Sequence, residues 1–175
     1  MSKVNVEDIT VKRYRYGDSL PALNTGREQV DHIYKHYISI LEQQQRAISN
    51  MFYLNSECVG FCILLTDRIS KSATKVFLGG SYPTFFPAIQ LYCIGVKKEY
   101  QSSGIGSSIM DWILYTVNEM RNNVGISFLV LESYNDEKLL EFYRSNEFVK
   151  WKYVIDPPED LIPLVYDFRG LEGDI

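Results

Sequence analysis

Apolar residues in the first third of the chain predict a strand, a helix and a hairpin, in that order. Ile9–Tyr16 looks like a first strand. From Val30 to Leu41, apolar residues recur at spacings of three and four, which places them along one face of a helix. Ala47–Leu54 and Cys58–Leu65 are both strand-like and flank a short polar turn, which is the pattern of a β-hairpin.

Glycine and proline punctuate the middle of the chain. Asp67–Pro87 contains two glycines and two prolines, so we expect it to be mostly irregular, apart from a strand fragment at Val76–Leu78. The apolar run Ile89–Val96 then predicts a buried strand. Gly104 and Gly106 open a strongly amphipathic helix.

The last third alternates strand and helix patterns. Ile126–Leu131 is a nearly continuous apolar run, which is typical of a strand in the centre of a sheet. Asp136–Ser145 predicts a short helix, and Lys150–Ile155 and Leu164–Phe168 look like closing strands. The second half is therefore a strand–loop–helix–strand–helix unit, and the chain belongs to the mixed α/β class.

Length and charge restrict the picture further. The 175 residues show no repeat or long linker, so we predict a single domain over residues 1–175. With 18 Lys and Arg against 22 Asp and Glu, the chain is not coated in nucleic-acid-binding charge. The three cysteines lie in apolar runs and are expected to be reduced, buried thiols. No signal peptide or bilayer-spanning run is present, which predicts a cytoplasmic protein without a membrane partner.

The loop Gln101–Gly106, between the buried strand and the amphipathic helix, is the most informative segment for function. Its glycines allow a tight turn, and the helix that follows directs unpaired N–H groups and its positive dipole end toward the loop. Such a loop can hold a pyrophosphate. It lacks the Gly-Lys-Ser/Thr of a Walker loop. It also has Ile109 where a dinucleotide fingerprint has its third glycine. The alternative is a glycine-rich turn that binds nothing.

Two segments resemble the GNAT superfamily of N-acetyltransferases. Leu91–Gly106 resembles its strand and coenzyme A loop, with the pattern Gln-x-x-Gly-x-Gly. Leu129–Phe148 resembles its later strand–Asn–helix segment, which ends in Phe-Tyr-x-x-x-Gly-Phe. This chain departs from the pattern at Glu147, where the family usually has Gly, and that puts the turn after the helix in doubt.

The resemblance implies a GNAT-like domain in which helices flank a central, twisted, mixed and mostly antiparallel sheet. It implies acetyl-CoA as co-substrate, no metal, and direct attack of a primary amine on the thioester in a ternary complex. The acceptor would be a small molecule, a peptide or a protein amine. The implied cofactor-binding residues lie on the strand, the loop and the later connection: Ile94, Val96, Gln101, Ser102, Ser103, Gly104, Ile105, Gly106, Ser107 and Asn135.

Two residues are implied in catalysis. Tyr143 would protonate the departing thiolate, because a phenol stays protonated at neutral pH. Its alternative role is packing beside Phe142. Glu132, at the exit of the buried strand, is the best-placed carboxylate for the general base, although such residues are often merely solvated. His32 and His36 are spaced as metal ligands on a helix but lie off its apolar face, so we interpret them as solvated.

Other functions stay open. The segment Leu23–Glu28, the hairpin, Tyr82–Pro87 and Val124–Ile126 resemble bacterial GNAT toxins, which acetylate aminoacyl-tRNA. Charged tRNA is therefore an alternative acceptor, although such toxins tend to be basic. A non-catalytic acyl-CoA-binding module on the same fold is a further alternative. The family resemblance and the abundance of aromatic residues also suggest a homodimer.

Overall fold

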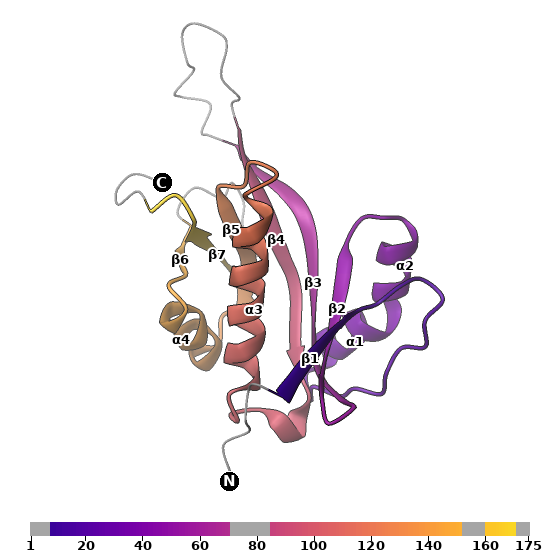
Figure 1. Cartoon of the computed structure of the whole chain (residues 1–175). Helices are drawn as coiled ribbons and strands as arrows, with labels where there is room; N and C mark the ends of the chain where they lie inside the picture. Colours follow the sequence, from indigo (N-terminus) through magenta and orange to yellow (C-terminus); the bar gives the residue numbers. More distant parts are fainter. Residues whose placement is uncertain (1–7, 71–84, 152–159, 171–175) are drawn as a thin grey trace, which may run out of the picture. The chain divides into compact units, whose positions relative to one another are not determined.

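The computed structural model describes residues 8–70, 85–151 and 160–170, and Figure 1 labels the helices and strands. A short 3₁₀ helix (Lys98–Tyr100) precedes the glycine loop. The other elements are, in chain order, β1 (Ile9–Arg13), α1 (Glu28–His36), α2 (Ile38–Gln43), β2 (Ile48–Leu54), β3 (Glu57–Ser70), β4 (Phe85–Val96), α3 (Ile105–Met120), β5 (Phe128–Tyr134), α4 (Glu137–Ser145), β6 (Val149–Lys150) and β7 (Leu161–Asp167).

The strands follow the order β1-β2-β3-β4-β5-β7-β6 in a seven-stranded sheet. The chain divides into two compact units. The first unit holds Met1–Leu65 and Leu91–Tyr115, and the second holds Thr66–Gln90 and Thr116–Ile175. The long strands β3 and β4 run through both units.

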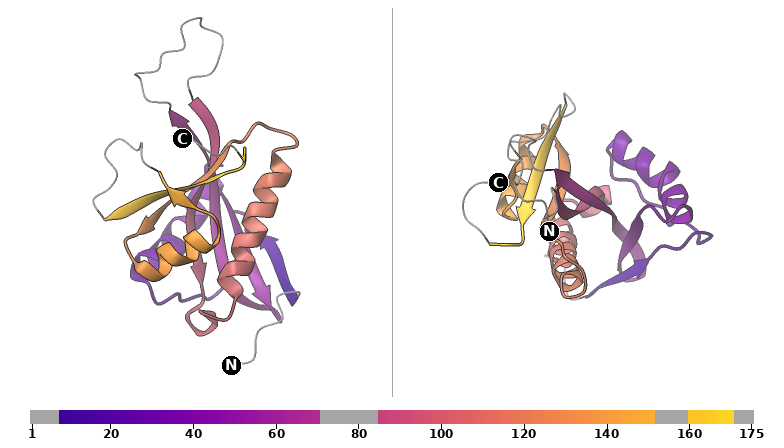
Figure 2. Two further views of the ribbon diagram at one scale, coloured as in Figure 1. Left: turned by 90° about the vertical axis from the view of Figure 1, so that its left-hand side faces the viewer. Right: turned by 90° about the horizontal axis from the view of Figure 1, so that it is seen from above.

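The first unit has helices on both faces of its strands. β1 pairs antiparallel with β2, and β2 pairs antiparallel with β3 in the predicted hairpin. On one face, α1 and α2 pack onto the strands (Figure 2) through a buried cluster that includes Tyr34, Ile38 and Phe61. On the other face, Trp112 of α3 meets Phe52 of β2 edge-on, with ring centroids 5.3 Å apart.

The predicted first helix is divided into two. α1 ends at His36 and α2 begins at Ile38, because Tyr37 has a φ of −106°, outside the usual helical range. The apolar face predicted from the sequence nevertheless continues across the break: Val30, Tyr34, Ile38 and Leu41 are all buried. The spacing thus gave the correct face and one helix too few.

The second unit is built around β5. β4 pairs with β5 in parallel from Ala88 to Gln90, and β7 pairs with β5 antiparallel along its whole length. Its apolar cluster contains Ala88, Phe128 and Val165. The guanidinium of Arg169 lies over the ring of Phe128, 4.5 Å from the ring centroid, and closes this core from the side of the C-terminal strand.

The sheet is mixed, as the resemblance implies, with one parallel pair among the strand pairs described. Antiparallel pairs join β1, β2 and β3 as well as β5, β7 and β6, while β4 and β5 are parallel. The reason is the connection between β4 and β5. It runs through α3, and a strand that returns through such a crossover helix enters the sheet in parallel.

The two strands that flank the glycine- and proline-rich segment are longer than predicted. β3 continues to Ser70 and β4 begins at Phe85, so both ends of Asp67–Pro87 are strands rather than irregular chain. Pro87 has no N–H, but its carbonyl oxygen accepts a hydrogen bond from the N–H of Ser127 at 2.8 Å. The predicted strand fragment at Val76–Leu78 lies outside the described residues.

Boundaries elsewhere differ by a few residues. β5 begins at Phe128 rather than Ile126, and β7 spans Leu161–Asp167 instead of Leu164–Phe168. α4 matches its predicted range, because Asp136 caps it by accepting hydrogen bonds from the N–H groups of Lys138 and Leu139. β6 is limited to Val149–Lys150, and the end of the strand predicted at Lys150–Ile155 lies outside the described residues.

Candidate functional site

The loop Gln101–Ser107 follows the 3₁₀ helix, continues into the first turn of α3 and has an unusual backbone. Ser102 has a φ of +60° and Gly104 a φ of +95°, both in the left-handed region. This conformation suits glycine and costs about 1–2 kcal/mol for another L-residue. A Cβ atom added at Gly104 would meet no heavy atom within 4 Å, so open space lies on that side of the loop.

A row of backbone donors is unpaired in this loop. Within the described part of the chain, the N–H groups from Ser102 to Ser107 find no backbone carbonyl at good hydrogen-bond distance and angle. Ser108 is the first residue whose N–H bonds back into the helix, to the carbonyl oxygen of Gly104 at 3.1 Å. Free N–H groups at the positive end of a sixteen-residue helix form a site for an anion. The loop therefore fits a pyrophosphate group.

Gln101 anchors the start of the loop. Its side-chain amide donates to the carbonyl oxygen of Thr25 at 2.8 Å and to that of Val96 at 3.1 Å. Its backbone N–H donates to the carbonyl oxygen of Lys98 at 3.3 Å. The structure thus shows Gln101 holding the loop to the segment before α1. A direct contact between Gln101 and the cofactor stays a prediction.

Ile94 and Val96 lie at the end of β4, in the same unit as the loop, and both are half-buried. Between them, Gly95 is a position that was not predicted from the sequence. A Cβ atom there would stand 2.3 Å from Cε1 of Phe61 and 2.9 Å from Cγ2 of Thr25. Only glycine fits between these side chains. A lone glycine within an apolar strand was the available signal.

The other three predicted residues belong to the second unit. Glu132 is exposed on β5, in register with Pro163 of β7. Asn135 is exposed in the connection between β5 and α4. Tyr143 is buried on α4, 6% exposed, and its ring contacts that of Phe142, with centroids 5.3 Å apart. The roles assigned to these three residues remain predictions.

The turn after α4 accommodates the departure at Glu147. This residue has a φ of +67°, which explains why glycine is the usual residue at the matching position. The turn is closed nevertheless: the N–H of Glu147 donates to Arg144 O at 3.0 Å, and that of Phe148 donates to Tyr143 O at 3.1 Å. Glu147 therefore strains the turn without opening it.

A polar cluster at the β2–β3 turn was also missed. The carboxylate of Glu57 accepts hydrogen bonds from Nζ of Lys97 and from the hydroxyl of Tyr100, the latter at 2.7 Å. These two hydrogen bonds hold the pKa of Glu57 below its usual value. The contact to Glu57 in turn raises the pKa of Lys97 and that of Tyr100. More than forty residues separate Glu57 from Tyr100, so no local pattern reveals the cluster.

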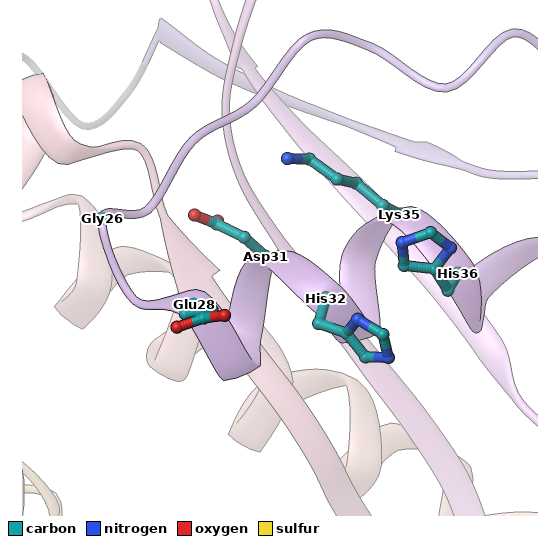
Figure 3. A pocket seen from close by; sticks show the side chains of 6 residues that line it. All are labelled: Gly26, Glu28, Asp31, His32, Lys35 and His36. Atoms are coloured by element: carbon teal, nitrogen blue, oxygen red, sulfur yellow. The ribbon is translucent and has the colours of Figure 1, made fainter.

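An open depression of about 410 Å³ lies along α1 and is lined by Gly26, Glu28, Asp31, His32, Lys35 and His36 (Figure 3). His32 and His36 are both exposed, with ring centroids 4.6 Å apart. The carboxylate of Asp31 accepts hydrogen bonds from the N–H and the hydroxyl of Thr25, each at 2.8 Å. Among the described residues, no three His, Cys, Asp or Glu side chains are grouped as metal ligands. Nor is any described helix long and apolar enough to cross a membrane.

No protein-family model matches the sequence, and no curated protein matches it by sequence. Solved structures do match by fold. A bacterial toxin has a TM-score of 0.77 at 16% identity, covering 92% of this chain and 91% of that one. AtaTR bound with acetyl-CoA has a TM-score of 0.77 at 17% identity, covering 93% and 95%. AtaT complexed with acetyl-methionyl-tRNAfMet has a TM-score of 0.73 at 16% identity, covering 93% and 96%. The chain therefore has the GNAT fold of these bacterial toxins, as the resemblance of its sequence implies.

Proposed function

We propose that this chain is an acetyl-CoA-dependent N-acetyltransferase that acts as one cytoplasmic domain and transfers an acetyl group to a primary amine. The observation that carries the proposal is the row of N–H groups from Ser102 to Ser107 at the start of α3, which find no backbone partner among the described residues. This row matches what a pyrophosphate needs and requires no basic side chain. The fold shared with a toxin complex that binds acetyl-CoA supports the same ligand.

Acetyl-CoA supplies the activated acetyl group as co-substrate. The chain would contribute backbone groups at Ile94 and Val96 toward the pantetheine arm, and Asn135 as a further hydrogen-bond partner. N–H groups near Ile94 would polarise the acetyl carbonyl as fixed dipoles. The amine nitrogen bonds to the acetyl carbon as the C–S bond breaks. Glu132 would accept the amine proton, directly or through water, and Tyr143 would donate a proton to the departing sulfur.

A calorimetric titration with acetyl-CoA tests the binding half of the proposal. Saturable binding to the folded chain is the expected result, and it justifies a screen of amine acceptors. If the folded chain binds no acetyl-CoA, the loop is a structural turn and the enzymatic proposal is wrong. If it binds but acetylates no acceptor, including charged tRNA, the chain is a non-catalytic acyl-CoA-binding module.

Tyr143→Phe tests the chemical half. Loss of the phenol should lower kcat about hundredfold or more, which is typical for loss of a general acid. The Kd for acetyl-CoA should not change, since the loop donors are intact. Tyr166→Phe is the matched control, because it removes a hydroxyl from a neighbouring aromatic residue of the second unit without a proposed chemical role. Turnover by Tyr143→Phe equal to that of the parent would rule out the general acid.

A second candidate acceptor is the amino group of aminoacyl-tRNA. It is favoured by the fold shared with AtaT, which has been solved with acetyl-methionyl-tRNAfMet. On this alternative, expression should arrest growth in a manner that requires acetyl-CoA binding, and purified protein should acetylate charged tRNA. Unimpaired growth at high expression, without any partner protein, would argue against it. A homodimer remains part of the proposal and can be measured by light scattering.

A further inference from the structure

The tight turn between β2 and β3 fixes the position of a carboxylate. Asn55 and Ser56 have φ values of +49° and +69°, which makes a two-residue hairpin turn with both central residues left-handed. Glu57 follows at once as the first residue of β3 and pairs with Leu54. The direction in which its side chain leaves the strand is therefore set by a short, closed turn.

This carboxylate bridges two residues of one short segment. Lys97 directly precedes the 3₁₀ helix before the glycine loop, Tyr100 ends that helix, and both side chains donate to Glu57. A backbone bond adds to this connection, because the N–H of Lys97 donates to the carbonyl oxygen of Val59 at 2.8 Å. The β2–β3 hairpin thus holds the segment before the loop through side-chain hydrogen bonds and through a backbone hydrogen bond.

The connection continues into the loop itself. The hydroxyl of Ser103 donates to the carbonyl oxygen of Tyr100 at 2.5 Å. Ser103 lies between Ser102 and Gly104, the two residues with left-handed backbone. A backbone of this kind persists only where its surroundings hold it in place. Glu57 holds Tyr100, and Tyr100 holds Ser103, the second residue in the row of N–H groups from Ser102 to Ser107.

Ordinary stabilisation of the fold does not account well for this arrangement. The side chain of Glu57 is 45% exposed and that of Lys97 is 22% exposed, and exposed ion pairs contribute little to folding stability. The start of the loop is also held independently by Gln101, which bonds to Thr25 and Val96. Glu57 and Gln101 are thus two anchors of the same loop on different parts of the first unit.

We propose that Glu57 is a positioning residue for the acetyl-CoA loop, which it acts on through Tyr100 and Lys97. The inference rests on the proposed function, since it assumes that the ordered loop binds acetyl-CoA. Glu57 touches no reacting atom in this proposal. It keeps the N–H groups from Ser102 to Ser107 in the arrangement that an anion needs before the anion arrives, and so lowers the cost of ordering the loop on binding.

The test compares Glu57→Ala, Glu57→Gln and the parent by acetyl-CoA titration and steady-state kinetics. Glu57→Ala should raise the Kd and the KM for acetyl-CoA about fivefold to tenfold, as expected for a lost preorganising contact, with kcat at saturation within about twofold of the parent. Glu57→Gln keeps an acceptor for the Tyr100 hydroxyl and should restore part of the affinity. Glu141→Gln is the matched control, because it breaks an exposed pair with Arg144 on α4 and should leave the Kd unchanged.

A double variant tests the route through Tyr100. If Glu57 acts through the phenol, Glu57→Ala with Tyr100→Phe should bind acetyl-CoA no more weakly than Glu57→Ala alone, within about twofold. Thermal unfolding confirms that each variant is folded. If the parent binds acetyl-CoA and Glu57→Ala binds it equally well, the positioning role is overturned while the proposed function stands. If the parent itself binds none, the proposed function fails and this role fails with it.

Discussion

Two turns of this chain adopt the same left-handed backbone and use it in opposite ways. The loop before α3 has positive φ at Ser102 and Gly104, and the turn after α4 has it at Glu147. After α4, the N–H groups of Glu147 and Phe148 both find carbonyl partners within the turn. Before α3, the N–H groups from Ser102 to Ser107 find none among the described residues.

The difference shows what makes a turn able to bind a ligand. A left-handed residue on its own indicates only that the chain reverses or strains at that point. The turn after α4 uses its donors to end a helix and to bury Phe148, which is 1% exposed. In the loop before α3 the donors have no partner among the described residues, and Gly104 and Ser107 are exposed. The state of the N–H groups, rather than the backbone angle, separates a packing turn from a binding loop.

Truncating Phe148 should have the largest effect, and it should fall on stability. The ring of Phe148 contacts Tyr143 and Tyr166, each with centroids 5.7 Å apart, so Phe148→Ala leaves a cavity in the second unit. We expect a loss of about 3–5 kcal/mol in the free energy of unfolding, measured by urea denaturation. The Kd for acetyl-CoA of the protein that remains folded should be unchanged. If Phe148→Ala instead weakened acetyl-CoA binding and left stability intact, the distinction between a packing turn and a binding loop would be wrong.

A side chain at Gly104 should act on binding instead. Gly104→Glu places a β-carbon at a φ of +95° and a carboxylate beside the free donors, so we expect the affinity for acetyl-CoA to fall at least about hundredfold. Gly170→Glu is the matched control, since Gly170 also has a positive φ, +64°, and nothing within 4 Å of an added Cβ atom. Calorimetry on both variants separates the effect of backbone strain at a positive φ from a direct effect on the acetyl-CoA site. Equal loss of affinity in the two variants would contradict the assignment of the loop.

Relief of strain at Glu147 should give the smallest effect. Glu147→Gly removes a side chain from a left-handed position and should raise the free energy of unfolding by less than about 1 kcal/mol, because glycine also gains freedom in the unfolded chain. Tyr166 reports on the same change: burial first, and then the Glu147 carboxylate, raises its pKa. In the variant that pKa should fall but stay above the usual value, as measured by ultraviolet titration. A clear loss of stability would mean that the contact with Tyr166 outweighs the strain.

Much of this could be predicted from the sequence because the decisive signals were local. The spacing of apolar residues gave the buried face from Val30 to Leu41, and the order of strand, glycine loop and helix led to Gln101–Gly106. The GNAT fold followed from two motifs at the correct separation. Local patterns did not show where α1 ends, because the break at Tyr37 is a backbone angle within a continuous apolar face.

What the sequence could not show depends on contacts between distant residues. The anchoring of Gln101 requires Thr25, 76 residues away, and the Glu57 cluster joins residues 40 and 43 positions apart. Pro87 within β4 was taken as a sign of irregular chain, because the sequence does not reveal that its missing N–H is not needed there. The requirement for glycine at position 95 becomes visible only once Phe61 lies against it.

The three buried cysteines make alkylation a natural probe of local opening in the first unit. Cys58, Cys62 and Cys93 are all free and buried, and burial raises the pKa of Cys62 and that of Cys93 to about 12. In the closed sheet these thiols are shielded from alkylating reagents and are almost entirely in the unreactive, protonated form. The rate at which the protein gains alkyl mass therefore follows how often strands β3 and β4 open, and it can be followed without any introduced label.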